Sequence, residues 1–276
     1  GLPSLVAVRQ GIYDSLDIKI DFITYASATD RDAAFLSGKL DGMLTDYPGA
    51  TLLQAKGSRL RLVMETDGSL SLIASKKSNV RNPDDLKGKD ISVSGNTFVE
   101  YATDEVMKRA CLHPGEVNKP EINNIPLRLM MLEDGQISAS FLPGPATAIA
   151  LNDGHTALLN TRQMGLRCTG IVFSEKAITE KDEEIRRFIT GYNLGVKYLQ
   201  TRPQNEWTEI LVKEFGLQEK AAMQIDLPDY RPATRPSYHD IEKIIAWLKS
   251  KGAIPDYYPG ENLVDTTFIP GTLKPQ

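Results

Sequence analysis

The stretch that decides the fold occurs twice, as FLSGKLDGMLTDYPGATLLQAKG at 35–57 and as LEDGQISASFLPGPATAIALNDG at 132–154. The second copy follows the first at a constant offset of 97 residues and needs no gap. Each copy predicts a helix end, a glycine, a short strand, a polar turn with proline, and a second helix that stops at glycine. A repeat of this length predicts two related α/β lobes rather than a solenoid. The matched pairs are Gly38 and Gly135, Leu40 and Ile137, Leu44 and Phe141, Pro48 and Pro145, and Gly57 and Gly154.

The first two-thirds of the chain alternate short strands with amphipathic helices, which is typical of a sheet covered by helices. Strands are predicted at 17–25, 42–45, 60–65, 70–75, 91–94, 122–125, 137–141, 158–159 and 168–174. Helices are predicted at 4–13, 28–36, 48–56, 98–109, 127–133 and 146–151. After Ser174 the pattern changes to helices with charged outer faces at 180–200, 205–215 and 238–251, and a wrapping tail follows. The strand before helix 98–109 has its counterpart just before Gly1, so we expect the sequence to begin one strand late.

Composition excludes several classes of protein. Of 276 residues, 41% are hydrophobic and 25% charged, and 32 basic against 36 acidic residues give a net charge of −4. A basic excess that would indicate nucleic-acid binding is missing, and no apolar run reaches the roughly 18–20 residues of a membrane span. The spacing of histidines and cysteines predicts no metal site and no cofactor. We expect Cys111 and Cys168 to be two free buried thiols, with one disulfide as the alternative, and His113 and His155 to lie at the surface.

Four runs of the sequence carry a family resemblance: PSLVAVRQGIYDSLDIKIDF at 3–22, FLSGKLDGMLTDYP at 35–48, NPDDLKGKDISVSGNT at 82–97 and IIAWLKSKGAIP at 244–255. In order and spacing they resemble the solute-binding proteins of ABC importers for sulfonates, nitrate, taurine and thiamine precursors. The resemblance implies a two-lobed α/β fold of the type II periplasmic-binding kind, with a mixed sheet flanked by helices in each lobe. It places lobe one at 1–78 plus 176–276, lobe two at 79–175, and hinge crossovers near 75–79 and 173–175.

The same resemblance implies a biological role. A small organic anion or heteroaromatic compound would bind between the lobes, and the membrane subunits of an ABC importer would receive it. The protein would be a monomer at the periplasmic or extracellular face, lipid-anchored or free, with any anchor on a segment before Gly1. It would use no catalytic residue, contact no nucleic acid and insert no part of this chain into a membrane.

The expected ligand site consists of turns where helices begin. In open α/β sheets, ligands bind beyond the carboxyl ends of strands, and helix N-termini offer unpaired N–H groups. The turn SGNT at 94–97 is the strongest candidate, and helix capping is the alternative for this turn and for those of lobe one. Phe98 and Tyr101 would form an aromatic wall, or else pack in the core. The full set of expected ligand residues is Ser4, Ser27, Thr29, Asp46, Tyr47, Ser69, Ser94, Gly95, Asn96, Thr97, Phe98, Tyr101, Pro143 and Gly144.

Two other classes of protein compete with this interpretation. One is an enzyme on the same fold, of the dehydratase or pyrimidine-forming type, although only Asp46 in the candidate turns is ionisable. The other is an effector-binding module of a transcription factor, which would need a DNA-binding domain. No buried cationic side chain is evident as an anion partner. Arg128, at a helix start, comes nearest to that role, but a solvated arginine is the favoured interpretation. Trp207 and Trp247 are expected to pack in the core or between lobes.

Overall fold

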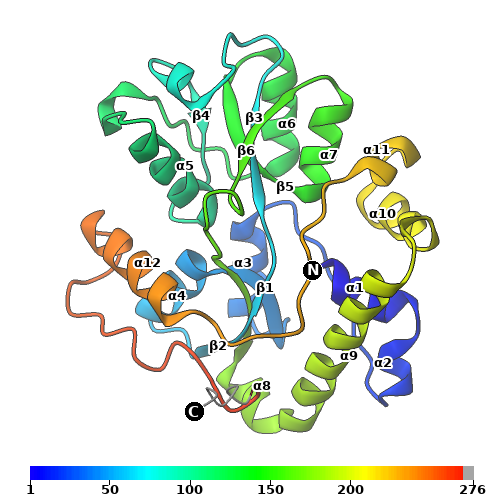
Figure 1. Ribbon diagram of the computed structural model, residues 1–276. Coiled ribbons are helices and arrows are strands. Elements are labelled where there is room, and N and C mark those ends of the chain that lie inside the picture. The colour runs from blue at the N-terminus through cyan, green and yellow to red at the C-terminus, as the bar shows by residue number, and fades with distance from the viewer. Residues whose placement is uncertain (270–276) are drawn as a thin grey trace, which may run out of the picture.

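Two separate β-sheets, one above the other in Figure 1, organise residues 1–269, which are the residues that the computed structural model describes. The first sheet has the order β1-β7-β2 and the second has the order β4-β5-β3-β6. Their strands are β1 (Gly42–Asp46), β2 (Leu60–Thr66), β3 (Leu70–Ala74), β4 (Ile91–Ser92), β5 (Ala139–Pro143), β6 (Thr156–Asn160) and β7 (Thr169–Ser174). The predicted two-lobed α/β fold is confirmed.

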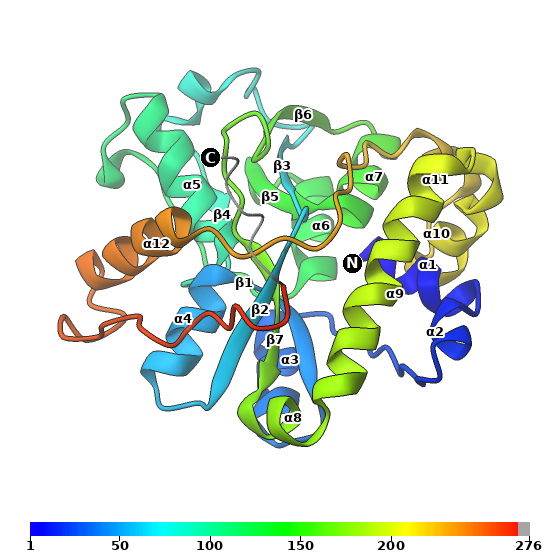
Figure 2. The ribbon, with the colours of Figure 1, turned by 60° about the horizontal axis from the view of Figure 1, so that its bottom comes forward.

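Helices cover both sheets (Figures 1 and 2). Around the first sheet lie α1 (Leu2–Arg9), α2 (Ile12–Ser15), α3 (Ala28–Leu36), α4 (Tyr47–Ala55), α8 (Glu175–Glu180), α9 (Asp182–Thr201), α10 (Thr208–Phe215) and α12 (Tyr238–Ser250). Helix α11 (Glu219–Gln224) packs on α10 and on α7 (Gly144–Asn152) of the other lobe. The second sheet carries α5 (Phe98–Arg109), α6 (Ile125–Asp134) and α7 (Gly144–Asn152). Short 3₁₀ turns lie at η1 (Pro83–Leu86), η2 (Pro114–Glu116) and η3 (Gln204–Glu206). No helix within residues 1–269 is long and apolar enough to cross a bilayer.

The internal repeat is a structural repeat. Strand β1 and helix α4 begin and end at positions that match β5 and α7 at the same offset as the sequence copies. The glycine after each preceding helix has a positive φ, 77° at Gly38 and 74° at Gly135. Each copy therefore builds the same strand–turn–helix unit, one in each lobe.

The strand pairing places the crossings between the sheets elsewhere than predicted. Strand β7 pairs antiparallel with β1 and β2, whereas β3 pairs antiparallel with β5 and β6. The chain therefore crosses between sheets at 67–69 and at 161–168, not near 75–79 and 173–175. The turn at Asp67–Gly68 between the predicted strands 60–65 and 70–75 is no hairpin, because β2 and β3 belong to different sheets. Periodicity identified these strands but could not show which sheet would take each one.

Other local predictions are also wrong. Residues 17–25 form no strand despite their alternation, since Phe22 and Ile23 are exposed and no strand of the described chain lies beside them. The run 122–125 is not a strand either, because α6 begins at Ile125 and only Glu121 bridges to Val93. Helix α11 was not predicted; its six residues give too short a pattern.

The predictions for the cysteines and histidines are confirmed only in part. Both cysteines are free, Cys168 in the core, but Cys111 is exposed at the end of α5 rather than buried. His113 is exposed as expected. His155 is buried rather than at the surface: its Nδ1 accepts from the Lys76 amide at 3.0 Å, and its Nε2 lies 3.0 Å from Glu133.

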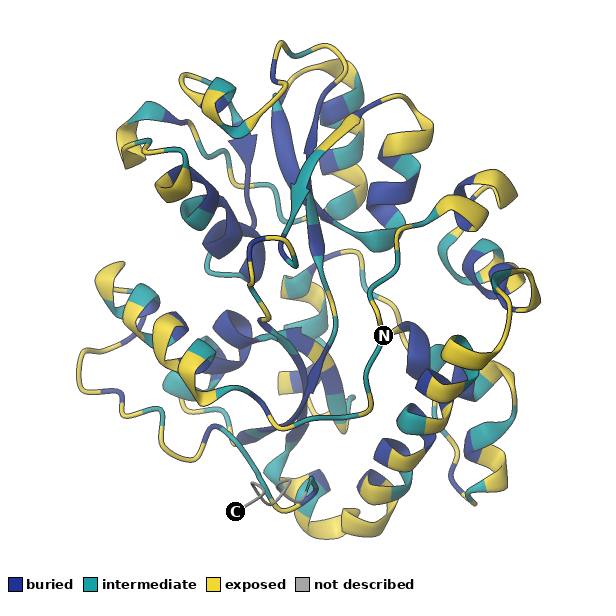
Figure 3. Cartoon of the chain, viewed as in Figure 1, coloured by how far each residue is buried: buried dark blue, intermediate teal, exposed yellow. Residues whose placement is uncertain are grey.

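The main hydrophobic core reaches across both sheets, and Figure 3 shows buried residues along the strands of each lobe. Leu60 and Val172 of the first sheet belong to the same cluster as Leu72 and Phe141 of the second. A smaller cluster fills the space between the second sheet and helices α6 and α7. Apolar packing therefore joins the two lobes in this arrangement.

Helix α9 packs closely on the N-terminal helices through two glycines. A Cβ atom at Gly195 would overlap the carbonyl oxygen of Pro3, and one at Gly191 would overlap the ring of Tyr13. Because the obstacle at Gly195 is backbone rather than a flexible side chain, α1 and α9 would have to move apart.

We expect Gly195→Ala to lower the free energy of unfolding by about 1–3 kcal/mol, the usual cost of overpacking. Urea unfolding followed by circular dichroism measures this. The matched control is Gly115→Ala, because a Cβ there meets nothing within 4 Å and φ is not positive. That variant should be neutral or slightly stabilised. Equal stability of the two variants would contradict the close α1–α9 packing.

Candidate functional site

Helices of both lobes begin on the side where the lobes meet. The amide of Phe98, the first residue of α5, donates to Asp46 Oδ2 at 3.2 Å, and Asp46 caps α4 of the other lobe. The amide of Ile125, the first residue of α6, donates to the carbonyl of Ala26 at 3.2 Å, just before α3. The structure therefore brings the candidate turns at 26–29, 45–47 and 94–98 to one interface.

Asp46 caps two helices at once. One carboxylate oxygen accepts from the Gly49 amide at 2.7 Å within α4, and the other accepts from Phe98. Burial raises the pKa of Asp46, while Arg31 and these two amides act in the opposite direction. A protein carboxylate thus already occupies the α5 N-terminus, which would otherwise suit a bound anion.

The turn at 94–97 is held by local hydrogen bonds. Ser94 donates to Asn123 Oδ1 at 2.7 Å, Thr97 donates to the Ser94 carbonyl at 2.8 Å, and Thr97 also caps α5. A Cβ at Gly95 would lie 2.8 Å from a Glu121 carboxylate oxygen. Asn96 has a positive φ of 55°, and its amide donates to Glu100 at 2.8 Å. The hydrogen bond to Asn123 therefore accounts for Ser94 and helix capping for Thr97, while the half-buried Asn96 side chain makes no hydrogen bond within residues 1–269.

The expected aromatic wall lies in the core. Phe98 and Tyr101 are both buried, and Tyr101 packs edge-on against Trp247 of α12 with ring centroids 5.3 Å apart. The Trp247 indole donates to Asp104 at 2.9 Å. These contacts join α5 of one lobe to α12 of the other, so Trp247 packs between lobes as predicted. Trp207 is buried in a separate cluster, also as predicted.

Tyr47 belongs to a polar network beside the first crossing. Its buried hydroxyl donates to Glu65 at 3.1 Å, and Glu65 accepts from Arg231 at 2.9 Å. Arg231 also donates twice to Asp67, with its amide and its Nε each at 2.7 Å. Burial, with Glu65 beside it, raises the pKa of Tyr47 far above its ordinary value, so the phenol remains a hydrogen-bond donor. The network ties the 225–236 connector to the crossing.

The other lobe-one candidates occupy different environments. Ser27 caps α3, accepting from the Asp30 amide at 3.1 Å and donating to its carboxylate at 2.7 Å. Thr29 is exposed, whereas Ser4 is buried inside α1. Helix capping thus explains Ser27, and nothing in the structure joins Ser4 to the other candidates.

A cavity of about 220 Å³ contains the candidates Ser69 and Gly144. It lies between α7 with its neighbouring strand β3 and the segment of α11, which stand beside each other in Figures 1 and 2. Ser71, Thr147 and Asn152 add polar groups on one wall, and Lys220 and Asp226 do so on the other. Pro143 caps α7 at its edge. This is a small polar hollow at the carboxyl end of β5, where ligands of α/β sheets bind.

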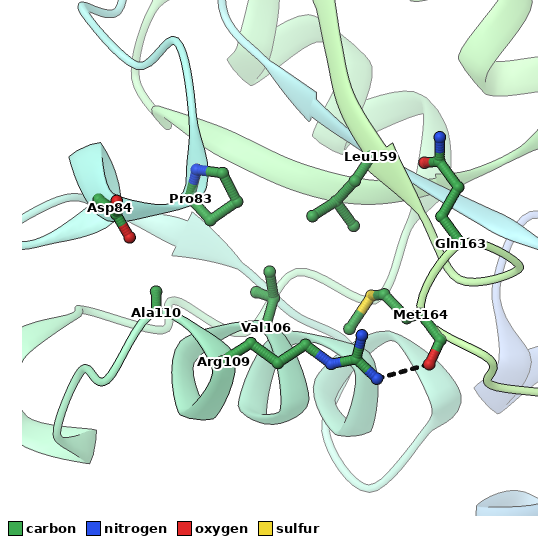
Figure 4. Close-up of a pocket in the computed structure, with 8 residues that line it drawn as sticks. All are labelled: Pro83, Asp84, Val106, Arg109, Ala110, Leu159, Gln163 and Met164. Atoms are coloured by element: carbon green, nitrogen blue, oxygen red, sulfur yellow. Dashed lines mark hydrogen bonds between the residues drawn. The ribbon is translucent and has the colours of Figure 1, made fainter.

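A second cavity, of about 250 Å³, lies in lobe two against the returning crossing (Figure 4). Val106 and Arg109 of α5 face Leu159 and Met164, and Arg109 donates to the Met164 carbonyl. None of the candidate residues lines it. It therefore adds nothing to the predicted site.

Sequence reasoning missed a buried cation. Arg128 was expected to be solvated, but it is only 2% exposed, and its Nη1 donates to the Phe141 carbonyl at 3.1 Å. Burial lowers the pKa of Arg128 to about 10, so the guanidinium stays charged at neutral pH. The signal was present: Arg128 stands three residues after Ile125 and four before Leu132, on the inward stripe of α6.

Burial raises the pKa of the Cys168 thiol well above its ordinary value, which disfavours the reactive thiolate. Within residues 1–269, no three His, Cys, Asp or Glu side chains gather closely enough to hold a metal ion.

Comparisons with known proteins agree with this architecture. A putative thiamine biosynthesis protein of Haemophilus influenzae is 21% identical over 266 residues, spanning 91% of this chain and 83% of that protein. The alkanesulfonate-binding protein SsuA of Xanthomonas axonopodis, solved with MOPS, superposes with a TM-score of 0.78 at 19% identity, covering 92% and 91% of the two chains.

Two further solved structures share the fold. The periplasmic nitrate-binding protein NrtA of Synechocystis has a TM-score of 0.77 at 12% identity and covers 93% of this chain and 80% of its own. The desulfurization enzyme DSZB has a TM-score of 0.67 at 12% identity, covering 96% and 94%. At such identities these likenesses establish the periplasmic-binding-protein fold alone.

The family is shown by a direct match to the sequence. A family model described as NMT1/THI5 like matches residues 2–206. Because that match covers well over half of the chain and agrees with the resemblance found in the sequence, the protein belongs to the NMT1/THI5-like family.

Proposed function

We propose that this protein is an extracytoplasmic solute-binding protein that captures a small organic anion or heteroaromatic compound between its lobes. The observation that carries the proposal is the meeting of helix-starting turns from both lobes at Asp46 and Phe98. Helix N-termini and polar turns of both lobes gather at this meeting point, so a small guest there can contact both lobes. The polar cavity beside Ser69 and Gly144 gives room for such a guest at the same edge of the second sheet.

Closure of the lobes around the ligand would be the change that the importer recognises. Two crossings form the hinge, and a ligand that touches both lobes favours the closed arrangement by its differential affinity. The contacts Asp46–Phe98 and Ala26–Ile125 would form and break with that movement. The membrane subunits of an ABC importer would then read the closed shape, with the binding protein acting as a monomer at the periplasmic or extracellular face. No covalent step is required.

The names of the similar proteins support this class of ligand. Alkanesulfonate and nitrate are oxyanions, and the Haemophilus relative is named for thiamine biosynthesis. Because a desulfurization enzyme has the same fold, an enzymatic function is the alternative to solute binding. The protonated state of Cys168 and the local capping roles of the candidate turns favour binding over catalysis.

A ligand panel tests the function. We expect one class among alkanesulfonates, aromatic acids, pyrimidines and nitrate to raise the melting temperature. At a hundred times Kd the stabilisation is about 2.7 kcal/mol. Small-angle scattering should show a smaller radius of gyration with that ligand, and chromatography should recover it unchanged. Chemical conversion would favour the enzyme, and no stabilisation by any class would contradict the proposed function.

Asn96 offers a site-specific test, because its side-chain amide is free to meet a ligand. We expect Asn96→Ala to weaken the affinity for the panel's best compound, measured by titration calorimetry. Asn96→Gly is the control for backbone strain, since glycine keeps the positive φ that alanine disfavours. Loss in both variants indicates a side-chain contact. Unchanged affinity in both removes this turn from the site.

We expect the free energy of unfolding to depend on pH through Asp46. Its pKa is raised in the folded state, so the folded protein holds this proton more tightly than the unfolded chain does. The stability linked to that proton is complete below the unfolded pKa, about 3.9, and is lost as pH rises through the folded pKa. Asp46→Asn cannot ionise, so its free energy of unfolding relative to wild type should increase from pH 3.5 to pH 7.

Urea unfolding at several pH values measures this difference. The exposed Asp153 gives the control variant Asp153→Asn, which should show no comparable increase. A flat or falling difference for Asp46→Asn would show that its carboxylate is not buried between the lobes in solution.

A further inference from the structure

Arg128 is a buried cation whose charge has no counterpart. It is 2% exposed, its Nη1 donates only to the Phe141 carbonyl and, at 3.5 Å, to the Ser140 hydroxyl, and its Nε has no hydrogen-bond partner. Among residues 1–269 no carboxylate forms an ion pair with it, and burial alone lowers its pKa. A buried charge without a partner costs several kcal/mol, and buried charges in proteins are therefore normally paired.

One serine hydroxyl, that of Ser140, contacts this guanidinium, and Ser92 pairs with Ser140 on the neighbouring strand. Ser140 donates to the Ser92 carbonyl at 3.1 Å, and the fully buried Ser92 hydroxyl has no partner within the described chain. Strands β4 and β5 pair only at Ile91–Ala139 and Ser92–Ser140. The cluster therefore lies at the carboxyl end of β4, whereas β5 continues past it to Pro143. Ligands of α/β folds bind beyond the carboxyl ends of strands.

The surroundings make a purely structural explanation weak. The same layer between the sheet and α6 is filled by Leu132, Ile137 and Leu142, all buried. A methionine at position 128 would fill similar space without desolvating a charge. An arginine at position 128 therefore lowers the stability of the fold relative to an apolar side chain of similar size.

Access to Arg128 depends on the contact between the lobes. Helix α6 begins at Ile125, whose amide donates to Ala26 of the other lobe. Separation of the lobes breaks this contact and uncovers the first turn of α6, so the inference rests on the proposed function. At the neighbouring α5 N-terminus, Asp46 already supplies a negative charge. The positive site left for an anion is therefore at α6.

We propose that Arg128 binds the anionic head of the ligand, a sulfonate or carboxylate, with the hydroxyls of Ser92 and Ser140 as further hydrogen-bond partners. The organic part would extend along β5, from Ser140 toward the cavity at Gly144, which follows the last residue of that strand. The ligand class is then a small organic anion, in preference to a neutral heteroaromatic compound.

Matched probe pairs test this assignment by titration calorimetry. Ethanesulfonate is compared with ethanesulfonamide, 2-phenylethanesulfonate with its sulfonamide, and benzoate with benzamide. We expect at least one anion to bind, and its neutral partner to bind about a hundredfold more weakly or not at all. Arg128→Met should weaken that anion by about a hundredfold, the range expected on removing one partner of a buried charge pair. Arg81→Met is the control, because Arg81 is an exposed arginine of the same lobe that also donates to backbone carbonyls.

A second measurement separates binding from structure. Without ligand, Arg128→Met should melt at or above the wild-type temperature, since it removes an unpaired buried charge. A structural arginine would instead give a lower melting temperature. If Arg128→Met fails to fold, Ser92→Ala replaces it, with an expected loss of about tenfold for the anion.

The outcomes distinguish the two proposals. Neutral probes, or pyrimidines, binding in place of anions would overturn the role of Arg128 and leave the proposed function intact. The same conclusion follows if both Arg128→Met and Ser92→Ala keep the affinity for the anion. Failure of every probe and of the whole ligand panel would overturn both proposals.

Discussion

Two chain crossings that run side by side hold the lobes together, and the rest of the structure depends on them. Thr66 and Thr169 join the crossings by a hydroxyl–hydroxyl bond of 2.9 Å, and the Leu70 amide donates to Thr161 at 3.1 Å. Each crossing delivers a strand that then lies inside the sheet it enters, β3 in one and β7 in the other. Neither sheet is complete without chain from beyond a crossing, so the movement proposed above would be a rotation about these two segments.

Charge is distributed unevenly across the interface between the lobes. Asp46 brings a carboxylate from lobe one to the start of α5, where helix amides stabilise it. Arg128 lies at the start of α6 in lobe two and meets only carbonyl and hydroxyl groups. One helix terminus is thus satisfied by the protein itself, and the neighbouring one keeps a positive charge unpaired. If the proposed site binds a ligand, this difference would favour an anion over a neutral compound.

Side chains also pack across the interface between the lobes, independently of any ligand. Tyr101 and Trp247 pack across the interface, and Lys251 pairs with Glu100 beneath them. Opening would separate these groups and expose part of the core cluster that spans both sheets. Under the proposed function, the lobes would close on this partly apolar surface, and the ligand would supply the remaining difference in free energy.

The sequence by itself determined the repeated unit, because helix-ending glycines and the strand–turn–proline order are local signals. The turns after helices α3 and α6 place Gly38 and Gly135 at a positive φ, which glycine adopts without strain. Strands β1 and β5 follow close to their predicted positions. The sequence also determined the family and the helix-starting turns. Only the tertiary structure decided where the chain crosses between sheets and that Arg128 is buried. Strand pairing, and the burial of a side chain under a sheet, depend on partners far away in the sequence, and no local pattern specifies those partners.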